Sequence, residues 1–397
     1  MKALWITSAY PSEIQPGSGV FHETQAKALT KLGVEVSVVC PVPKRISSLL
    51  PLKERYRELG EIPKEYIRNG IRVLRPEYTA LPGQLRWAQP GKRIAEAVYR
   101  TGIIEELEPD LIHAHFAMPS GGAARLLSKR TGLPWLLTLH GSDVNVYPHY
   151  SRSARAAFIH SMRDAHSVLS VGGRLREKAL SISGRDSSIL PLGVDLARFQ
   201  TTSEPKAVTK KRLRLPADKK IVLFAGRLTR EKGVFELADS LKRLRADTAV
   251  VFAGAGPAAA RLREYPEFGD RLFLTGEVEN REIRDYMNAS DVFALPSYTE
   301  GMPTVVIEAL ALKLPVAATL VGSLPELFGK YSRLLFEPRQ EDQLAERITE
   351  YLKGGMDLEA MKKELFEKIH EHYHAGRNAL LLKEEYSRVI QGAGISI

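Results

Sequence analysis

The chain has 397 residues, of which 44% are hydrophobic and 26% are charged, and its formal net charge is +10 at pH 7. This composition is that of a soluble globular protein, and the length exceeds one ordinary core but fits two α/β domains. No apolar run approaches the ~20 residues that cross a bilayer. The opening run 1–6 is too short for a secretory signal, and the single cysteine, Cys40, excludes internal disulfides, so we expect a cytoplasmic protein.

Short β-branched runs alternate with amphipathic helical runs, a pattern typical of βαβ units and parallel sheets. In the first half of the chain the pattern predicts strands at 2–7, 34–39, 71–75, 110–115, 135–139 and 167–170, and helices at 20–32, 91–107 and 120–131. Residues 200–219 are polar and basic, which is typical of a linker. A second series follows, with strands predicted at 221–224, 248–253, 271–274, 292–295 and 316–318.

These patterns predict an α/β fold of two Rossmann-like domains, each with a doubly wound parallel sheet. We place an N-terminal domain at 1–200, a C-terminal domain at 201–376, and a final helix at 377–397 that packs back on the N-terminal domain. In tandem sheets of this kind, ligands bind at the carboxyl ends of the strands, facing the crevice between the domains. The architecture indicates an enzyme with two substrates but leaves its chemistry open.

The most informative segment, residues 291–310, is predicted to be a buried strand, a short loop and a helix that opens near Pro303. Free backbone N–H groups at the start of that helix form an anion site. Glu300 precedes the helix, and Glu308 lies about one turn inside it, leaning toward its N-terminus. Both carboxylates can therefore reach a bound phosphate ester and accept hydrogen bonds from sugar hydroxyls. The alternative is that Glu300 caps the helix and Glu308 faces solvent.

Two cationic residues, Arg227 and Lys232, lie in the loop that follows the first strand of the second series. Transfer of a sugar from a nucleotide diphosphate requires stabilisation of the negative charge that grows on the leaving group. An arginine supplies a bidentate grip and a lysine a point charge. Because the sequence contains no Asp-x-Asp pair, we expect no metal ion. The alternative is a loop with ordinary surface charges.

Together these segments resemble family 4 of the glycosyltransferases, which are retaining enzymes with the GT-B fold. The resemblance rests on Gly226-Arg227-(x4)-Lys232-Gly233 and on Glu300-(x7)-Glu308, and it extends through 315–319 and 322–326. Weaker similarities lie at 17–19, 113–115, 138–143 and 191–195, so that nearly the whole chain is covered. The chain departs from the family pattern at Lys313, at Ser323 and at Met302-Pro303.

The resemblance implies a role for each matching residue. Arg227 and Lys232 would bind the donor diphosphate, Glu308 the ribose hydroxyls, and Glu300 the donor sugar. The sugar would also meet the backbone of Gly301, Met302, Pro303 and Thr304. Gly19 would let the first helix approach the phosphate, and His140 would point at the transferring sugar. The implied catalytic residues are thus Glu300, Arg227, Lys232 and His140, acting on a UDP- or GDP-sugar without a cofactor.

Residues 41–100 hold thirteen Lys and Arg against six Glu, beside Tyr56, Tyr66, Tyr78, Trp87 and Tyr99. Basic residues beside amphipathic aromatics are typical of surfaces that meet an anionic membrane, nucleic acid or a phosphate-bearing acceptor; the alternative is a solvated face with core aromatics. With the habits of the resembled family, this stretch indicates a sugar, polysaccharide or lipid-linked acceptor and peripheral contact with the inner face of the cell membrane. We expect no nucleic acid, and a role in surface polysaccharide or glycolipid synthesis.

Other functions compete with this interpretation. Residues 254–259 follow a strand and fit the dinucleotide fingerprint, so a two-domain NAD-dependent dehydrogenase is one alternative. That motif belongs to the first βα unit of a dinucleotide domain, whereas here it falls in the second unit. A nucleotide-sugar epimerase would share the expected fold. His113 and His115 alternate onto one strand face that a metal could use, but without further clustered ligands a structural role is favoured.

Overall fold

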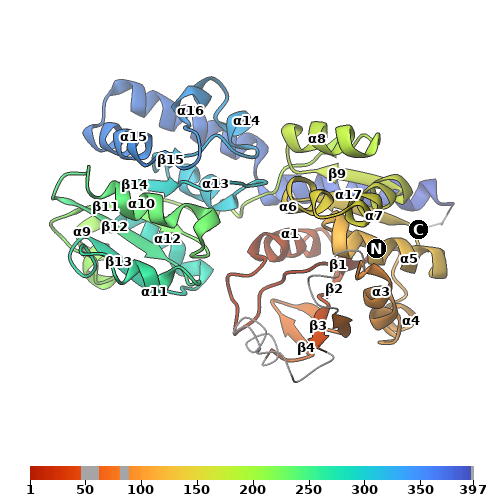
Figure 1. Ribbon diagram of the computed structural model, residues 1–397. Helices are drawn as coiled ribbons and strands as arrows, with labels where there is room; N and C mark the ends of the chain where they lie inside the picture. The colour runs from red at the N-terminus through yellow and green to blue at the C-terminus, as the bar shows by residue number, and fades with distance from the viewer. Residues whose placement is uncertain (46–61, 81–88, 395–397) are drawn as a thin grey trace. The chain divides into compact units, whose positions relative to one another are not determined.

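The computed structural model describes residues 1–45, 62–80 and 89–394, and the chain divides into two units (Figure 1). The first unit joins Met1–Leu192 to Ala375–Ile397, and the second runs from Gly193 to His374. The boundaries expected from the sequence lay after residues 200 and 376. Because Ala375–Ile397 is part of the first unit, the C-terminal helix belongs to the unit that contains the N-terminus.

The first unit is built on a sheet with the strand order β10-β9-β8-β7-β1-β2-β5-β4. Neighbouring strands are parallel except β4, which pairs antiparallel with β5. A separate parallel pair joins β3 to β6. The bounds are β1 (Lys2–Ile6), β2 (Glu35–Val39), β3 (Val42–Arg45), β4 (Glu65–Arg68), β5 (Ile71–Leu74), β6 (Glu77–Ala80), β7 (Leu111–His115), β8 (Trp135–Leu139), β9 (Ser167–Ser170) and β10 (Ser188–Ile189).

Helices follow most strands of this sheet. They are α1 (Val20–Thr30), α3 (Gly91–Tyr99), α4 (Ile103–Leu107), α5 (Gly122–Thr131), α6 (Ser142–Asn145), α7 (Arg152–Asp164), α8 (Gly173–Ser183) and α17 (Ala375–Gly392). Strands β7 and β8 are buried along their whole length, as near-continuous apolar runs covered on both faces should be. The largest side chains of this core include Trp5, Trp135 and Phe158.

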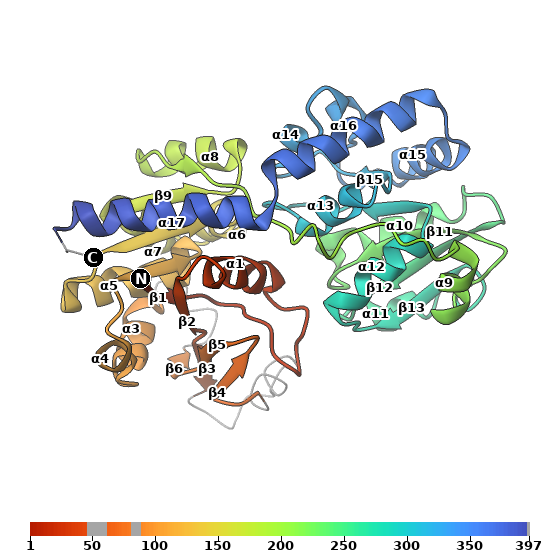
Figure 2. The same ribbon diagram turned by 180° about the vertical axis from the view of Figure 1, so that it is seen from behind.

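Helix α17 lies along the first sheet beside α1 (Figure 2). Its buried residues recur with helical spacing, at Ala379, Leu382, Tyr386 and Ile390, and they join the core formed by α1, β1 and β2. Burial of each large apolar side chain contributes roughly 1.5–3 kcal/mol, so this stripe holds the chain's last helix in the first unit.

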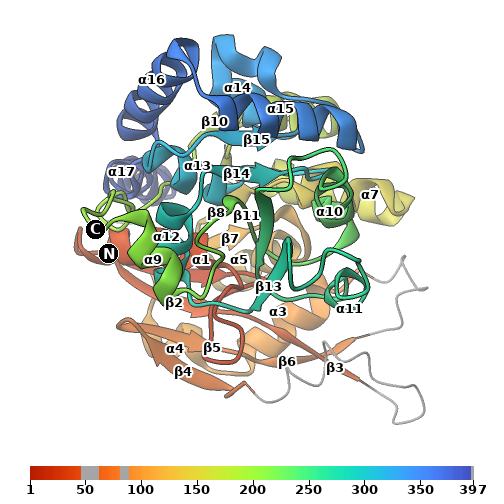
Figure 3. The same ribbon diagram turned by 90° about the vertical axis from the view of Figure 1, so that its left-hand side faces the viewer.

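In the described residues, the second unit contains one parallel sheet with the order β13-β12-β11-β14-β15, whose strands are labelled in Figure 1. Figure 3 shows β11, β13, β14 and β15 of this sheet from another side. The bounds are β11 (Lys220–Ala225), β12 (Thr248–Ala253), β13 (Leu272–Gly276), β14 (Val292–Leu295) and β15 (Val316–Ala318). Its helices are α9 (Lys206–Arg212), α10 (Val234–Ser240), α11 (Ala259–Leu262), α12 (Asn280–Ala289), α13 (Thr304–Ala311), α14 (Leu324–Phe328), α15 (Glu341–Lys353) and α16 (Met356–His372). Phe224, Phe252 and Phe293 fill the sheet's core.

The expected α/β class with parallel sheets in both units is confirmed. The sequence pattern missed the short strands β3, β4, β6 and β10, and two predicted segments also differ from the structure. The helix predicted at 91–107 is two helices, because Gly102 adopts a left-handed φ of 71° between α3 and α4. The predicted linker at 200–219 contains α9, whose Thr209 and Lys210 are buried.

Candidate functional site

The order in which the chain adds strands to the second sheet reverses between β11 and β14. From β11 the chain proceeds outward to β12 and β13, and it then returns to the other side of β11 with β14 and β15. The loops after β11 and β14 therefore both begin at the carboxyl ends of these two neighbouring parallel strands. The point where the strand order reverses is where open α/β sheets bind ligands. Arg227 and Lys232 follow β11, and Glu300 follows β14, so the two segments singled out in the sequence meet at this switch point.

Backbone contacts hold these two loops together. Lys232 ends a short 3₁₀ turn, and Gly233 follows it with a φ of 70°. A Cβ at Gly233 would lie 2.0 Å from the carbonyl oxygen of Pro296, so only glycine permits this approach. The Tyr298 N–H also donates to the carbonyl of Glu231 at 2.8 Å. The cationic turn is thereby fixed against the loop that leads to Glu300.

Lys232 and Glu300 form an ion pair. The Lys232 Nζ lies 2.6 Å from the Glu300 Oε1, and the side chains are 33% and 10% exposed. Helix α13 has no side-chain cap among the described residues, so the alternative that Glu300 caps it is wrong. Arg227 is exposed in the same loop as Lys232. The arrangement offers a diphosphate two cations, and the Lys232 cation holds the Glu300 carboxylate.

Helix α13 begins at Thr304, immediately after Pro303. Gly301 and Thr304 are half-buried, whereas Met302 and Pro303 are buried. The other carboxylate, Glu308, lies inside the helix and is 8% exposed, so the alternative that it faces solvent is wrong. Burial raises the pKa of Glu308 to about 7, against a smaller opposing effect of the Arg198 charge. At neutral pH this group is therefore divided between its acid and its carboxylate form.

The loop before α13 is also fixed by the segment after β15. Gly322 has a φ of 56°, and a Cβ there would lie 2.4 Å from the Gly301 carbonyl oxygen. The backbone N–H of Ser323 donates to that same carbonyl at 2.9 Å. Ser323, which departs from the family's glycine pair, is thus accommodated through its backbone, with its side chain buried.

The glycines of the dinucleotide-like motif serve the same loop. A Cβ at Gly254 would lie 2.0 Å from the Gly226 carbonyl oxygen, and one at Gly256 would lie 2.3 Å from that of Leu228. These glycines therefore let β12's loop pack against the backbone that carries Arg227. This packing explains the motif without a dinucleotide.

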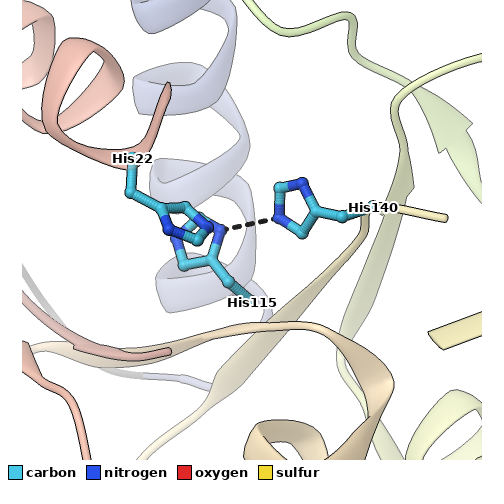
Figure 4. A group of neighbouring side chains, drawn as sticks. All are labelled: His22, His115 and His140. Carbon is cyan, nitrogen blue, oxygen red and sulfur yellow. Dashed lines mark hydrogen bonds between the residues drawn. The ribbon is translucent and has the colours of Figure 1, made fainter. Parts of the chain in front are cut away.

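In the first unit, His22, His115 and His140 gather at the carboxyl edge of the first sheet (Figure 4). They come from α1, from the end of β7 and from the residue after β8. One ring nitrogen from each lies within 4.8 Å of the others, and the His115 Nδ1 is 3.1 Å from the His140 Nε2. The expectation that His115 lacks clustered ligands is therefore wrong. His22 was not singled out in the sequence, because only the docking of α1 on this sheet brings it there.

These histidines are neutral. Burial lowers the pKa of His22 to about 3 and lowers the pKa of His115 and of His140 well below the ordinary value. His113 lies two residues before His115 on β7, and both of its ring nitrogens are hydrogen-bonded. The partners are the Tyr386 hydroxyl at 2.7 Å and the Thr138 hydroxyl at 2.8 Å. His113 therefore has the structural role that the sequence favoured.

Asp143 organises the loop that carries His140. Its buried carboxylate accepts hydrogen bonds from the backbone N–H groups of Ala117 at 2.9 Å, His140 at 3.1 Å and Gly141 at 2.8 Å. The loops after β7 and β8 are thus tied to one side chain. In the sequence, the only signal for this role was the spacing of three residues after His140.

Gly19 stands just before α1 with a φ of 73°. A Cβ at this position would lie 2.5 Å from the Ala9 carbonyl oxygen, so the loop after β1 requires a glycine here. The first turn of α1 carries both His22 and Phe21, whose ring centroid is 5.1 Å from that of His140. Gly19 therefore fixes the helix start beside the histidines.

Part of the basic stretch 41–100, including Tyr56 and Trp87, lies outside the described residues. Several of its described cations are paired with carboxylates: Arg68 with Glu23, Arg72 with Glu65 and Glu106, Lys44 with Glu77, and Arg100 with Glu96. A pocket of ≈ 520 Å³ lies between β6 and α3, with Tyr78, Lys92 and Arg93 in its lining. In the described part of the chain, no helix is long and apolar enough to span a bilayer.

Comparison with known proteins finds a family model that matches most of each unit. Residues 17–193 match the model of the glycosyl transferase 4-like domain, and residues 205–368 match that of the glycosyl transferases group 1. TuaC, a glycosyltransferase assigned to teichuronic acid biosynthesis in Bacillus subtilis (strain 168), is 49% identical over 389 residues, which are 98% of this chain and 99% of TuaC. The D-inositol 3-phosphate glycosyltransferase of Xylanimonas cellulosilytica is 28% identical over 78% of each chain.

Solved structures share the fold. Sucrose-phosphate synthase from Thermosynechococcus elongatus has a TM-score of 0.77 at 20% identity, over 99% of this chain and 100% of that chain. Anabaena HepE in complex with UDP-glucose has a TM-score of 0.74 at 18% identity, over 98% and 99% of the two chains. The dehydrogenase and epimerase alternatives receive no support from these matches.

Proposed function

The chain belongs to the glycosyltransferases, with the GT-B fold of family 4, and from this premise we propose that it adds a sugar to a surface polysaccharide. We propose that the transfer retains the anomeric configuration and needs no metal ion. The identity with TuaC along nearly the whole chain supports an acceptor of the teichuronic acid type. The donor in this proposal is a uridine or guanosine diphosphate sugar, and the HepE structures with UDP and UDP-glucose support the uridine form.

The leaving diphosphate would bind at the switch point of the second sheet. Arg227 and Lys232 supply positive charge there, and α13 directs its free N–H groups toward the same edge. Because Lys232 already contacts Glu300, an arriving diphosphate takes over the ammonium group and releases the carboxylate. The released Glu300 can then accept hydrogen bonds from hydroxyls of the donor sugar. Glu308, buried one turn further, would hold the ribose hydroxyls.

In the proposed reaction, the bond between the anomeric carbon and the phosphate oxygen breaks while the acceptor oxygen bonds to that carbon on the same face. The acceptor proton passes to the leaving phosphate, so that no covalent enzyme intermediate forms. The cations lower the energy of the transition state by stabilising the charge that grows on the phosphate. His140 contributes a neutral imidazole, whose Nδ1 has no hydrogen-bond partner among the described residues and can contact a hydroxyl of the transferred sugar.

The observation that carries this proposal is the meeting of the Lys232–Glu300 pair and the start of α13 at one sheet edge. Incubation of the purified protein with UDP- and GDP-sugars and teichuronic acid fragments should give a lengthened product. Proton NMR of the new linkage should show the anomeric configuration of the donor. An inverted linkage would refute retention, and release of a free epimer without acceptor would refute transfer.

We predict that chelators leave the transfer rate unchanged, because cations and helix N–H groups occupy the role that a metal would have at the diphosphate. Rates should be compared before and after dialysis against EDTA, with magnesium and manganese added back to separate samples. Loss of activity that either metal restores would contradict the metal-free assignment.

A further inference from the structure

The three histidines of the first unit have the geometry of a metal site. The separation of 3.1 Å between the His115 Nδ1 and the His140 Nε2 is close to the roughly 3.3 Å between two ligand nitrogens of one tetrahedral ion. The nitrogen offered by His22 lies within 4.8 Å of both. In the described part of the chain, this is the one group of three or more His, Cys, Asp or Glu side chains so arranged.

The hydrogen bonds around His22 orient it as those around a metal-binding histidine do. Its Nδ1 lies 2.8 Å from the Ala9 carbonyl oxygen, which can only accept, so Nδ1 carries the proton. The buried Nε2 therefore keeps its lone pair, and it has no hydrogen-bond partner among the described residues. A carbonyl that accepts from the far nitrogen is the usual support of a ligating imidazole.

The chemistry of the donors selects the ion. The cluster offers neutral imidazoles and no carboxylate or thiolate, a set that suits zinc, cobalt, nickel or copper and not magnesium or calcium. We propose that His22, His115 and His140 bind one divalent transition-metal ion through a ring nitrogen each, with the fourth position open. His113, whose nitrogens face Tyr386 and Thr138, is not a ligand.

Occupancy of this site should inhibit sugar transfer, a consequence that rests on the proposed function of His140. A bound ion takes the Nε2 of His140, whose Nδ1 contacts the donor sugar in the proposed function, and so places a divalent positive charge beside that sugar. This charge opposes the positive charge that develops at the anomeric carbon as its bond to the phosphate breaks. The metal-free protein is then the active form, which agrees with an enzyme that needs no metal at the diphosphate.

Binding is tested on the full, tag-free chain with cobalt(II). One equivalent should give the intense visible absorption of a four-coordinate cobalt site, zinc should displace it, and the melting temperature should rise with either ion. Magnesium should neither displace cobalt nor raise the melting temperature. A wild-type protein that shows no such absorption and no shift in melting temperature overturns the site, whatever its activity.

Variants locate the ion. His22→Gln should weaken zinc binding by about tenfold or more, in the range that follows loss of a metal-site contact. His160→Gln, a change at an exposed histidine on α7, should leave it unchanged. Equal zinc affinity in wild type and His22→Gln overturns the assignment. Should His22→Gln fail to fold, the wild-type cobalt titration still decides whether the site exists.

Inhibition is measured separately from binding. Zinc should inhibit the wild type and the His160→Gln variant reversibly, with activity restored by EDTA, and it should inhibit His22→Gln at about tenfold higher concentration or more. Equal inhibition of all three proteins overturns the inhibitory role. If no variant or wild type transfers sugar at all, the proposed function fails, while the cobalt spectrum still reports on the metal site.

Discussion

The Lys232 ammonium group lies 2.6 Å from the Glu300 carboxylate, with which a diphosphate would compete in our proposal. We predict that Lys232→Ala and Arg227→Ala each lower kcat by about two orders of magnitude or more, as loss of a charge that stabilises the transition state does. Lys330→Ala is the matched control, because this exposed lysine of the same unit also pairs with a glutamate. Near-normal turnover in both site variants would contradict this account of the leaving group.

The two glutamates should respond differently to substitution. Glu300→Gln removes the charge that faces Lys232 and that contacts the donor sugar in our proposal, so it should mainly lower kcat. Glu308→Gln should mainly weaken nucleotide binding, because its partner in our proposal is the ribose. Steady-state kinetics and nucleotide titration distinguish the two effects. The reverse pattern would mean that the roles are exchanged.

Buried Glu308 also predicts a pH dependence of stability. Its folded pKa of about 7 lies above the unfolded value of 4.5, so the folded state binds more protons between these two values. The free energy of unfolding of the wild type should therefore fall as pH rises from 4.5 toward 7, and this loss should be absent in Glu308→Gln. Urea unfolding of both proteins at several pH values measures the difference. A difference that does not change with pH would refute the raised pKa.

At the residue scale, the sequence predicted that Arg227, Lys232, Glu300 and Glu308 form one site, but it could not predict the ion pair between Lys232 and Glu300. The pairing depends on β11 and β14 being neighbours in the sheet, which no local pattern specifies. His22 was missed for a related reason, since a single histidine in a helix's first turn carries no signal of the strand on which the helix docks.

Helix α17 is anchored by a buried chain of hydrogen bonds. The Trp5 Nε1–H donates to the Tyr386 hydroxyl at 2.9 Å, and the same hydroxyl is hydrogen-bonded to the His113 Nδ1 at 2.7 Å. We predict that Tyr386→Phe lowers the free energy of unfolding by about 2 kcal/mol or more, because two buried groups lose their partner. Urea denaturation measures the change.

The control for this prediction is Tyr10→Phe in the same unit. Tyr10 is also buried, but its hydroxyl has no hydrogen-bond partner among the described residues, so its removal should be close to neutral. If Tyr386→Phe is no more destabilising than Tyr10→Phe, the hydrogen-bond chain contributes nothing to the docking of α17.

Among the secondary-structure elements, the long buried strands were predictable and the short exposed ones were not. Strands β1, β2, β7 and β8 are apolar runs, and the sequence pattern located each of them. Strands β4 and β6 have only four residues each and alternate between exposed and half-buried positions. Their place is set by pairing with a neighbour, and such short, partly exposed segments carry little apolar periodicity.

Across the whole molecule, the sequence gives the net charge of +10 directly, but it does not show which positive side chains are paired with carboxylates. The sequence alone suggested that the positive residues of 41–100 are available to an anionic surface. The structure shows that Arg68 and Arg72 engage Glu23 and Glu106, which lie outside that stretch. Charges that appear in excess along the chain are thus partly balanced in space. Lys64 and Lys92, in contrast, are exposed.

We therefore predict that membrane contact, if the acceptor is lipid-linked, depends on Lys64 and Lys92 and not on the paired arginines. Each lysine near an anionic bilayer contributes ~1 kcal/mol, and the attraction fades beyond a Debye length of ~8 Å at physiological salt. Sedimentation with phosphatidylglycerol vesicles should show binding at low salt that is much weaker near ~0.5 M salt. The double change Lys64→Glu and Lys92→Glu should abolish this binding without altering nucleotide affinity. The control reverses two exposed lysines elsewhere, Lys178 on α8 and Lys363 on α16, and should bind vesicles more strongly than the test variant. A wild-type protein that ignores the vesicles at low salt would refute membrane contact, and a soluble acceptor would then be the better assignment for the same sugar transfer.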